Sequence, residues 1–118
     1  MIIPEFLKKI ENKEIVNSPR FKLFGNEFQI AVWPGNVNPQ FTSVFLMEGR
    51  KMKNQTTSVT FLERSGAQHS GERVVEFLSH EKFKTWAENH SDVFKLMATV
   101  TLHKKRDGDG WVRYCRPF

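Results

Sequence analysis

The chain has 118 residues, which suits one domain and is too short for two of ordinary size. Hydrophobic residues make up 39% of the chain and charged residues 26%, a balance that indicates a globular fold and excludes the disordered, collagen-like and membrane-spanning classes. A formal net charge of +5 favours acidic partners at long range, but the basic residues are scattered and do not form the dense run typical of nucleic-acid binding.

The amino-terminal segment combines an early proline with apolar residues at helical spacing. Residues 4–13 predict either a short helix that begins near Pro4 or a strand that docks on a sheet. The apolar positions behind this prediction are Ile3, Phe6, Leu7 and Ile10. Pro4 and Glu5 interrupt the apolar stretch that a signal peptide would need, so we expect an intracellular protein without membrane insertion, in the cytoplasm or, as the alternative, in the nucleus.

The first strong strand signal lies at residues 28–33, where apolar side chains alternate with a period of two. Phe28, Ile30 and Val32 fall on one face. The turn residues 34–36 end this strand, and residues 41–47 continue in β-favouring types. We expect the two strands either to pair as a hairpin or to face each other across a sandwich. Rings that alternate in this way usually fill a core, so the core is predicted to include Phe28, Trp33 and Phe94.

The middle of the chain predicts a strand at residues 58–62, followed by a polar loop at residues 63–71. Residues 71–90 are ambiguous. Val74, Val75, Phe77 and Leu78 favour a strand, whereas Ser79 is a suitable N-cap for a helical turn within residues 79–87. We therefore expect a strand and then a single helical turn.

The strongest late signal is at residues 93–103, where five apolar positions alternate with five others and predict a central strand. Those positions are Phe94, Leu96, Ala98, Val100 and Leu102. The tail begins with Asp107-Gly108-Asp109-Gly110, which is typical of a turn; it resembles part of a calcium loop but lacks the closing glutamate. The four apolar residues beyond it are expected to dock on the fold.

Several of these stretches together resemble a known family. SPRF at residues 18–21 is followed by GNEFQIAVWPGN at 25–36 and by FTSVFLM at 41–47. Their order and spacing resemble the opening of a MATH domain, the carboxyl-terminal domain of the TRAF adaptors, in which Ser-Pro-x-Phe leads to Gly-x-x-Trp-x-Leu-x-Val-Tyr-Pro-x-Gly. Phe28, Ile30 and Trp33 stand in the Trp, Leu and Tyr positions. The likeness resumes at residues 77–83 and 92–102.

The resemblance implies an all-β fold, an antiparallel β-sandwich of seven or eight strands, and the alternation agrees with it independently. The sandwich would span residues 17–106, between an N-terminal segment (1–16) and a C-terminal tail (107–118). The resemblance also implies a module that binds short extended peptides of partner proteins, as in ubiquitin-ligase substrate adaptors and receptor-signalling adaptors. It further implies possible self-association, because TRAF relatives trimerise.

The peptide site implied by the resemblance consists of Phe45, Arg73 and Val74. Phe45 falls where the family's strand has a groove-facing aromatic ring. Arg73 and Val74 lie in the segment GERV, which replaces the family's Asp-Trp-Gly-Phe and lacks both of its rings. Arg73 would attract an acidic or phosphorylated peptide.

The sequence contains no recognisable pattern of catalytic residues. The four histidines and Cys115 show no ligand or nucleophile spacing, and no phosphate-binding glycine loop occurs. A single cysteine also excludes an internal disulfide. We therefore expect no enzyme, no cofactor and no metal. The alternative to peptide recognition is a basic β-domain that binds nucleic acid, which rests on net charge alone.

Overall fold

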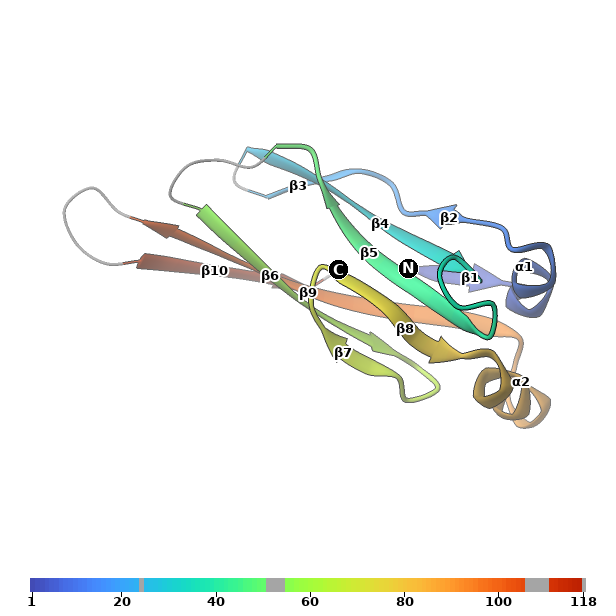
Figure 1. Ribbon diagram of the computed structural model, residues 1–118. Helices are drawn as coiled ribbons and strands as arrows, with labels where there is room; N and C mark the ends of the chain where they lie inside the picture. The colour runs from blue at the N-terminus through green and yellow to red at the C-terminus, as the bar shows by residue number, and fades with distance from the viewer. Residues whose placement is uncertain (24, 51–54, 106–110, 118) are drawn as a thin grey trace.

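The computed structural model describes residues 1–23, 25–50, 55–105 and 111–117, and the side chains as far as residue 103. Two antiparallel sheets stack face to face, and the two helices lie together at one end (Figure 1). The expected all-β sandwich is therefore confirmed at the level of architecture. No helix in the described ranges has the length and apolar character needed to span a membrane.

One layer, which we call the β9 sheet, is built around the longest strand. It contains β1 (Ile2–Pro4), β9 (Val93–Lys105), β6 (Gln55–Glu63) and β7 (Gln68–Ser70) in that order, with β10 (Trp111–Pro117) also paired to β9. Neighbours on both sides make β9 the central strand that its alternation predicts. The backbone of the tail forms a strand, because β10 pairs with β9 from Trp111↔Lys105 to Pro117↔Thr99. Phe118 and the side chains of the other apolar tail residues lie outside the described part.

The other layer, the β4 sheet, contains the first predicted hairpin. Its order is β2 (Val16–Asn17), β4 (Asn26–Pro34), β5 (Phe41–Glu48) and β8 (Arg73–Ser79), with β3 (Phe21–Leu23) also paired to β4. β4 and β5 pair directly, which settles the choice in favour of a hairpin. Gly35 at the turn has φ +70°, a conformation that glycine adopts without steric cost.

The strand number exceeds the expected seven or eight because, in each sheet, two short strands pair one after the other with the same edge of a longer strand. β1 and β10 pair with the same edge of β9, and β2 and β3 pair with the same edge of β4. Each sheet of the described chain is therefore four strand positions wide. The interruption between β2 and β3 falls at Ser18-Pro19, where proline has no N–H to donate to a ladder.

The core lies between the sheets and follows the predicted alternation. Phe28 is 1% exposed and Phe94 is fully buried, as predicted. Trp33 is the exception, since 39% of its surface is exposed. It alternates with Phe28, Ile30 and Val32, and only that set faces the other sheet. The prediction that Trp33 belongs to the core was therefore wrong.

Both helices pack against the end of the sandwich through aromatic rings. α1 (Phe6–Asn12) buries Phe6, whose ring stacks on Phe94 at 4.5 Å and meets Phe83 edge-on at 5.1 Å. Phe83 belongs to α2 (His80–Asn89), whose ten residues are more than the single turn expected. Ser79 caps α2 as predicted by accepting from the N–H of Lys82. The helix continues because no proline or glycine interrupts residues 80–89.

The predicted loop at residues 63–71 contains a short strand, β7, which pairs with β6. Glu63 organises the turn before it. The residue is 1% exposed, and its carboxylate accepts from the N–H and hydroxyl of Ser65 and, at 3.3 Å, from the N–H of Lys95. The predicted turn at residues 107–110 lies outside the described residues.

Candidate functional site

The outer surface of the β4 sheet carries exposed apolar side chains that no other part of the described chain covers. Register places Trp33 opposite Ser43, Ala31 opposite Phe45 and Gln29 opposite Met47, with Arg73 opposite Phe45 on the next strand. Because side chains alternate between faces, these positions share the face turned away from the core. We call this surface the Phe45 face; it consists of Gln29, Ala31, Trp33, Ser43, Phe45, Met47 and Arg73.

Small residues form the floor of the Phe45 face and large ones rise around them. Ala31 is 2% exposed and Ser43 is fully buried, whereas Trp33 and Met47 are 39% and 41% exposed. The Ser43 hydroxyl donates to the Val75 carbonyl oxygen at 2.8 Å, so it needs no further partner. The floor therefore presents few polar groups that lack a hydrogen-bond partner, and a ligand would bind there mainly through apolar packing.

Two of the three site residues expected from the sequence lie together. The Arg73 guanidinium carbon is 5.6 Å from the centre of the Phe45 ring, a cation–π contact between cross-strand neighbours. Val74 is not with them. It pairs with the buried Val44 and packs against the core, on the opposite side of the sheet. Adjacent strand residues point to opposite faces, so Arg73 and Val74 cannot both line one surface.

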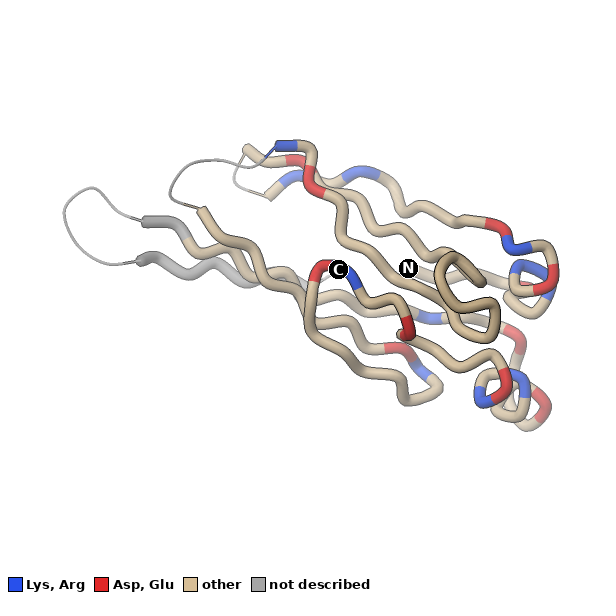
Figure 2. Tube along the Cα trace, viewed as in Figure 1, with Lys and Arg blue, Asp and Glu red and all other residues tan. Residues whose placement is uncertain are grey.

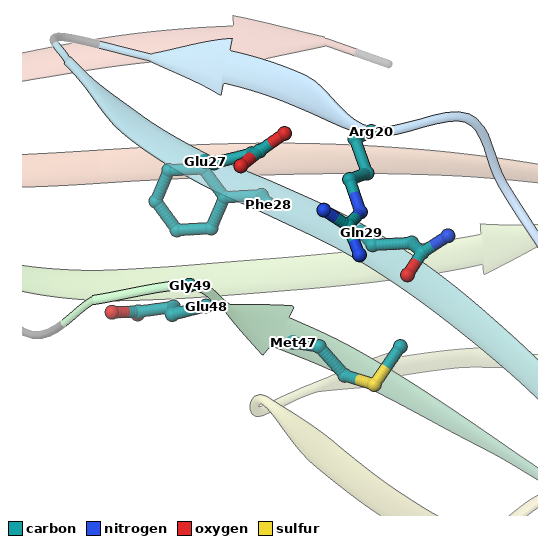
Figure 3. Close-up of a pocket in the computed structure, with 7 residues that line it drawn as sticks. All are labelled: Arg20, Glu27, Phe28, Gln29, Met47, Glu48 and Gly49. Atoms are coloured by element: carbon teal, nitrogen blue, oxygen red, sulfur yellow. The ribbon is translucent and has the colours of Figure 1, made fainter.

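The Phe45 face continues into a hollow of about 200 Å³ at the far ends of β4 and β5. Figure 3 shows Arg20 reaching across toward Gln29, with Met47 on the neighbouring strand. The remaining lining residues are Glu27, Phe28, Glu48 and Gly49. Arg20 forms no ion pair or side-chain hydrogen bond with a described residue. A second cation therefore flanks the Phe45 face on the side away from Arg73.

The edge of the β4 sheet at Arg73 has no further strand paired to it in the described part of the chain, although β7 of the other sheet lies beside the carboxyl-terminal half of β8. β8 pairs with β5 and is the last strand in the order of its sheet. One side of its backbone is therefore outside any ladder of that sheet, and such edges are where extended peptides add.

Trp33, Met47 and Arg20 were missed as site residues. The alternation that separates Trp33 from Phe28 could have identified Trp33.

Three of the four histidines contact neighbouring side chains of the fold. The His80 ring nitrogen Nε2 lies 2.8 Å from the Thr42 hydroxyl, and burial lowers the pKa of His80 from its ordinary value. His90 stacks on Trp86 at 4.5 Å, and His69 meets Phe77 edge-on at 5.7 Å. Among the residues that the structure describes, no group of three His, Cys, Asp or Glu side chains could hold a metal ion. The Cys115 side chain lies outside the described part.

Comparison with protein-family models, with curated proteins and with solved structures found no match for this chain. The resemblance to MATH domains therefore depends on the motifs themselves.

Proposed function

We propose that this domain is a MATH-like protein-interaction module that binds a short extended peptide on the Phe45 face. The observation that carries the proposal is the cation–π pair between the half-buried Phe45 and the exposed Arg73 of β8, a strand to which no further strand pairs among the described residues. Exposed apolar surface rimmed by charge is typical of interaction sites. The motif resemblance supports the same function.

The peptide would lie alongside β8 and extend the sheet by one strand. Its backbone would bond to the unpaired side of β8, which gives affinity without reading sequence. Every second side chain would then project on the side of the sheet that carries the Phe45 face, because side chains alternate along a strand. Phe45 and Met47 offer apolar contact to one such side chain, and Arg73 offers a charge-assisted bond to a neighbouring acidic or phosphorylated one.

A peptide-array screen against the full chain, followed by titration of the best peptide, tests this proposal. Phe45→Ala and Arg73→Glu should each weaken binding by about tenfold or more, the loss expected for a central interface residue. The matched controls lie elsewhere on the fold. Arg64→Glu removes a guanidinium 5.8 Å from the Trp86 ring, and Leu62→Ala truncates a side chain that is 40% exposed on the β9 sheet.

The controls should bind the peptide as the unmodified chain does. Unchanged binding in both Phe45→Ala and Arg73→Glu would remove the Phe45 face from consideration. Nucleic-acid binding is the alternative. Among the residues whose side chains the structure describes, Lys and Arg are interspersed with Asp and Glu and form no surface comparable to the Phe45 face (Figure 2). Oligonucleotide binding that falls steeply with salt, with no peptide selected by the array, would replace the proposal.

A further inference from the structure

The outer surface of the β9 sheet carries a second group of exposed apolar side chains, on the opposite side of the sandwich from the Phe45 face (Figure 1). Register places Leu62 of β6 opposite Met97 of β9, and Ile2 of β1 opposite Lys95. Ile2 is 65% exposed, Met97 51% and Leu62 40%. They face outward because the β9 residues that alternate with Lys95 and Met97 are buried in the core. We call this surface the Met97 face; it consists of Ile2, Leu62, Arg64, Lys95 and Met97.

A hollow of about 400 Å³ lies in the Met97 face. All residues of the face line it, together with Met1, Glu63, Gly66 and Leu96. The next outward-facing pair along β6 and β9 is Thr60↔Thr99, so the apolar surface ends there. An exposed apolar surface of limited extent that is bordered by polar residues is typical of a protein-interaction site.

The charges exposed at the Met97 face are positive. Lys95 and Arg64 are both exposed, and neither forms an ion pair with a described residue. The N–H of Arg64 donates to the carbonyl oxygen of Lys95 at 3.0 Å, so the two residues lie side by side. The one acid that lines the hollow is Glu63, which is 1% exposed and whose carboxylate accepts from Ser65 and from the N–H of Lys95. A partner therefore meets two cations here and no exposed carboxylate of a lining residue.

We propose that the Met97 face is a second docking surface, which takes a segment of a partner protein that carries a large apolar side chain next to an acidic one. The apolar side chain would enter the hollow against Ile2, Leu62 and Met97, and the carboxylate would pair with Lys95. Apolar burial supplies affinity, while the exposed cations and the net charge of +5 select an acidic segment. With the Phe45 face on the other sheet, one domain would hold two partner segments at once.

The charge of the Met97 face also distinguishes this partner from two other occupants. A second copy of the chain would bring Lys95 and Arg64 of both copies around one apolar centre, with no exposed lining acid to pair with them. A membrane surface would insert no side chain into the hollow, and anionic lipid is commonly recognised by clusters of about four to eight basic residues. The hollow and its two cations therefore favour an acidic protein segment.

Selection of a phage library of random peptides on the full chain, followed by titration of the enriched peptides, tests this proposal. Peptides of the Met97 face should carry Asp or Glu next to Leu, Met or Phe. Met97→Ala and Lys95→Glu should each weaken their binding about tenfold, as at a central interface residue. Lys22→Glu and Val37→Ala change an exposed cation and an exposed apolar side chain elsewhere, and should leave the affinity unchanged. Replacing the acidic residue of the peptide by lysine should restore binding to Lys95→Glu.

Further variants separate this surface from the Phe45 face and from other occupants. Leu62→Ala should act as Met97→Ala does, and thermal unfolding shows that each variant is folded. Arg73→Glu should weaken only peptides of the Phe45 face, so either surface can fail without the other. Selection of no peptide, or of peptides that bind Met97→Ala and Lys95→Glu unchanged, would overturn the proposal. Binding to vesicles of equimolar phosphatidylcholine and phosphatidylserine, or self-association in sedimentation, would overturn it too if Met97→Ala abolished that behaviour.

Discussion

Phe6 of α1 packs against α2 and β9, two consecutive elements that are far from it in the sequence, and its truncation should cost much of the stability of the fold. The ring is fully buried and contacts Phe94 of β9 and Phe83 of α2. Replacing a core phenylalanine by alanine costs about 3–5 kcal/mol, because the apolar transfer free energy is lost and a cavity remains. Each aromatic pair accounts for about 0.5–1.5 kcal/mol of such a loss. We therefore expect Phe6→Ala to lower the free energy of unfolding by about 4 kcal/mol.

A second substitution at the same position separates volume from ring contacts. Phe6→Leu keeps most of the volume and loses both ring pairs, so we expect a loss of about 1.5 kcal/mol. Urea denaturation followed by tryptophan fluorescence measures both values, and Trp86 is a suitable reporter because its ring lies 5.9 Å from that of Phe83. Phe45→Ala is the control and should cost less than about 1 kcal/mol, since that ring is on the outer face.

A loss from Phe6→Ala no larger than that from the Phe45→Ala control would show that the Phe6 ring does not hold the core together. A loss concentrated in the helices, with the sheets intact, would also contradict that role, because Phe94 belongs to the central strand of the β9 sheet. The domain is of a size whose total stability is about 5–15 kcal/mol, so the expected loss moves the urea midpoint by an easily measured amount.

Three further results are expected. Ser18→Ala leaves the N–H of Ile30 buried without its acceptor and should lower the free energy of unfolding by about 1–3 kcal/mol, while an unchanged urea midpoint would exclude that role. Ser79→Ala removes the acceptor of the Lys82 N–H and should cost about 0.5–1 kcal/mol, with lower helicity by circular dichroism; equal thermal midpoints would count against the cap. Burial lowers the pKa of His80 in the folded state, so the unfolded chain binds more protons, and the free energy of unfolding should fall as pH drops through 6.5 and level off below the folded pKa. His80→Gln should flatten this dependence, and parallel pH profiles for the two proteins would contradict it.

The strands that the sequence predicts well are those whose alternation is local. Residues 28–33 and 93–103 show a period of two that one buried face imposes, and both are strands in the structure. β1 and β7 could not be predicted this way, because each has three residues and depends on pairing with a distant strand. The pairing of Ile3 with Phe94 joins opposite ends of the chain, which no local pattern records.

The candidate site was predictable in part for the same reason. Phe45 lies on a regular strand, and its outward direction follows from the buried Val44 and Leu46 on either side. Val74 was expected beside Arg73, although neighbouring strand residues cannot share a face. Arg20 lies between β2 and β3, so it comes close to the Phe45 face only when those strands pair with β4. Contacts between side chains on different strands depend on the register of strand pairing, which cannot be read from the sequence.

The central claim is that two stacked sheets share one core and leave the Phe45 face to bind an extended peptide. Amide chemical-shift mapping of the isotope-labelled full chain, titrated with the peptide selected by the array, tests it most directly. We predict shifts that cluster on β4, β5 and β8, with slowed hydrogen exchange along β8 as the added strand pairs with it. Shifts confined to β6 and β9, or a bound peptide that leaves the amides of β8 unchanged, would contradict the account.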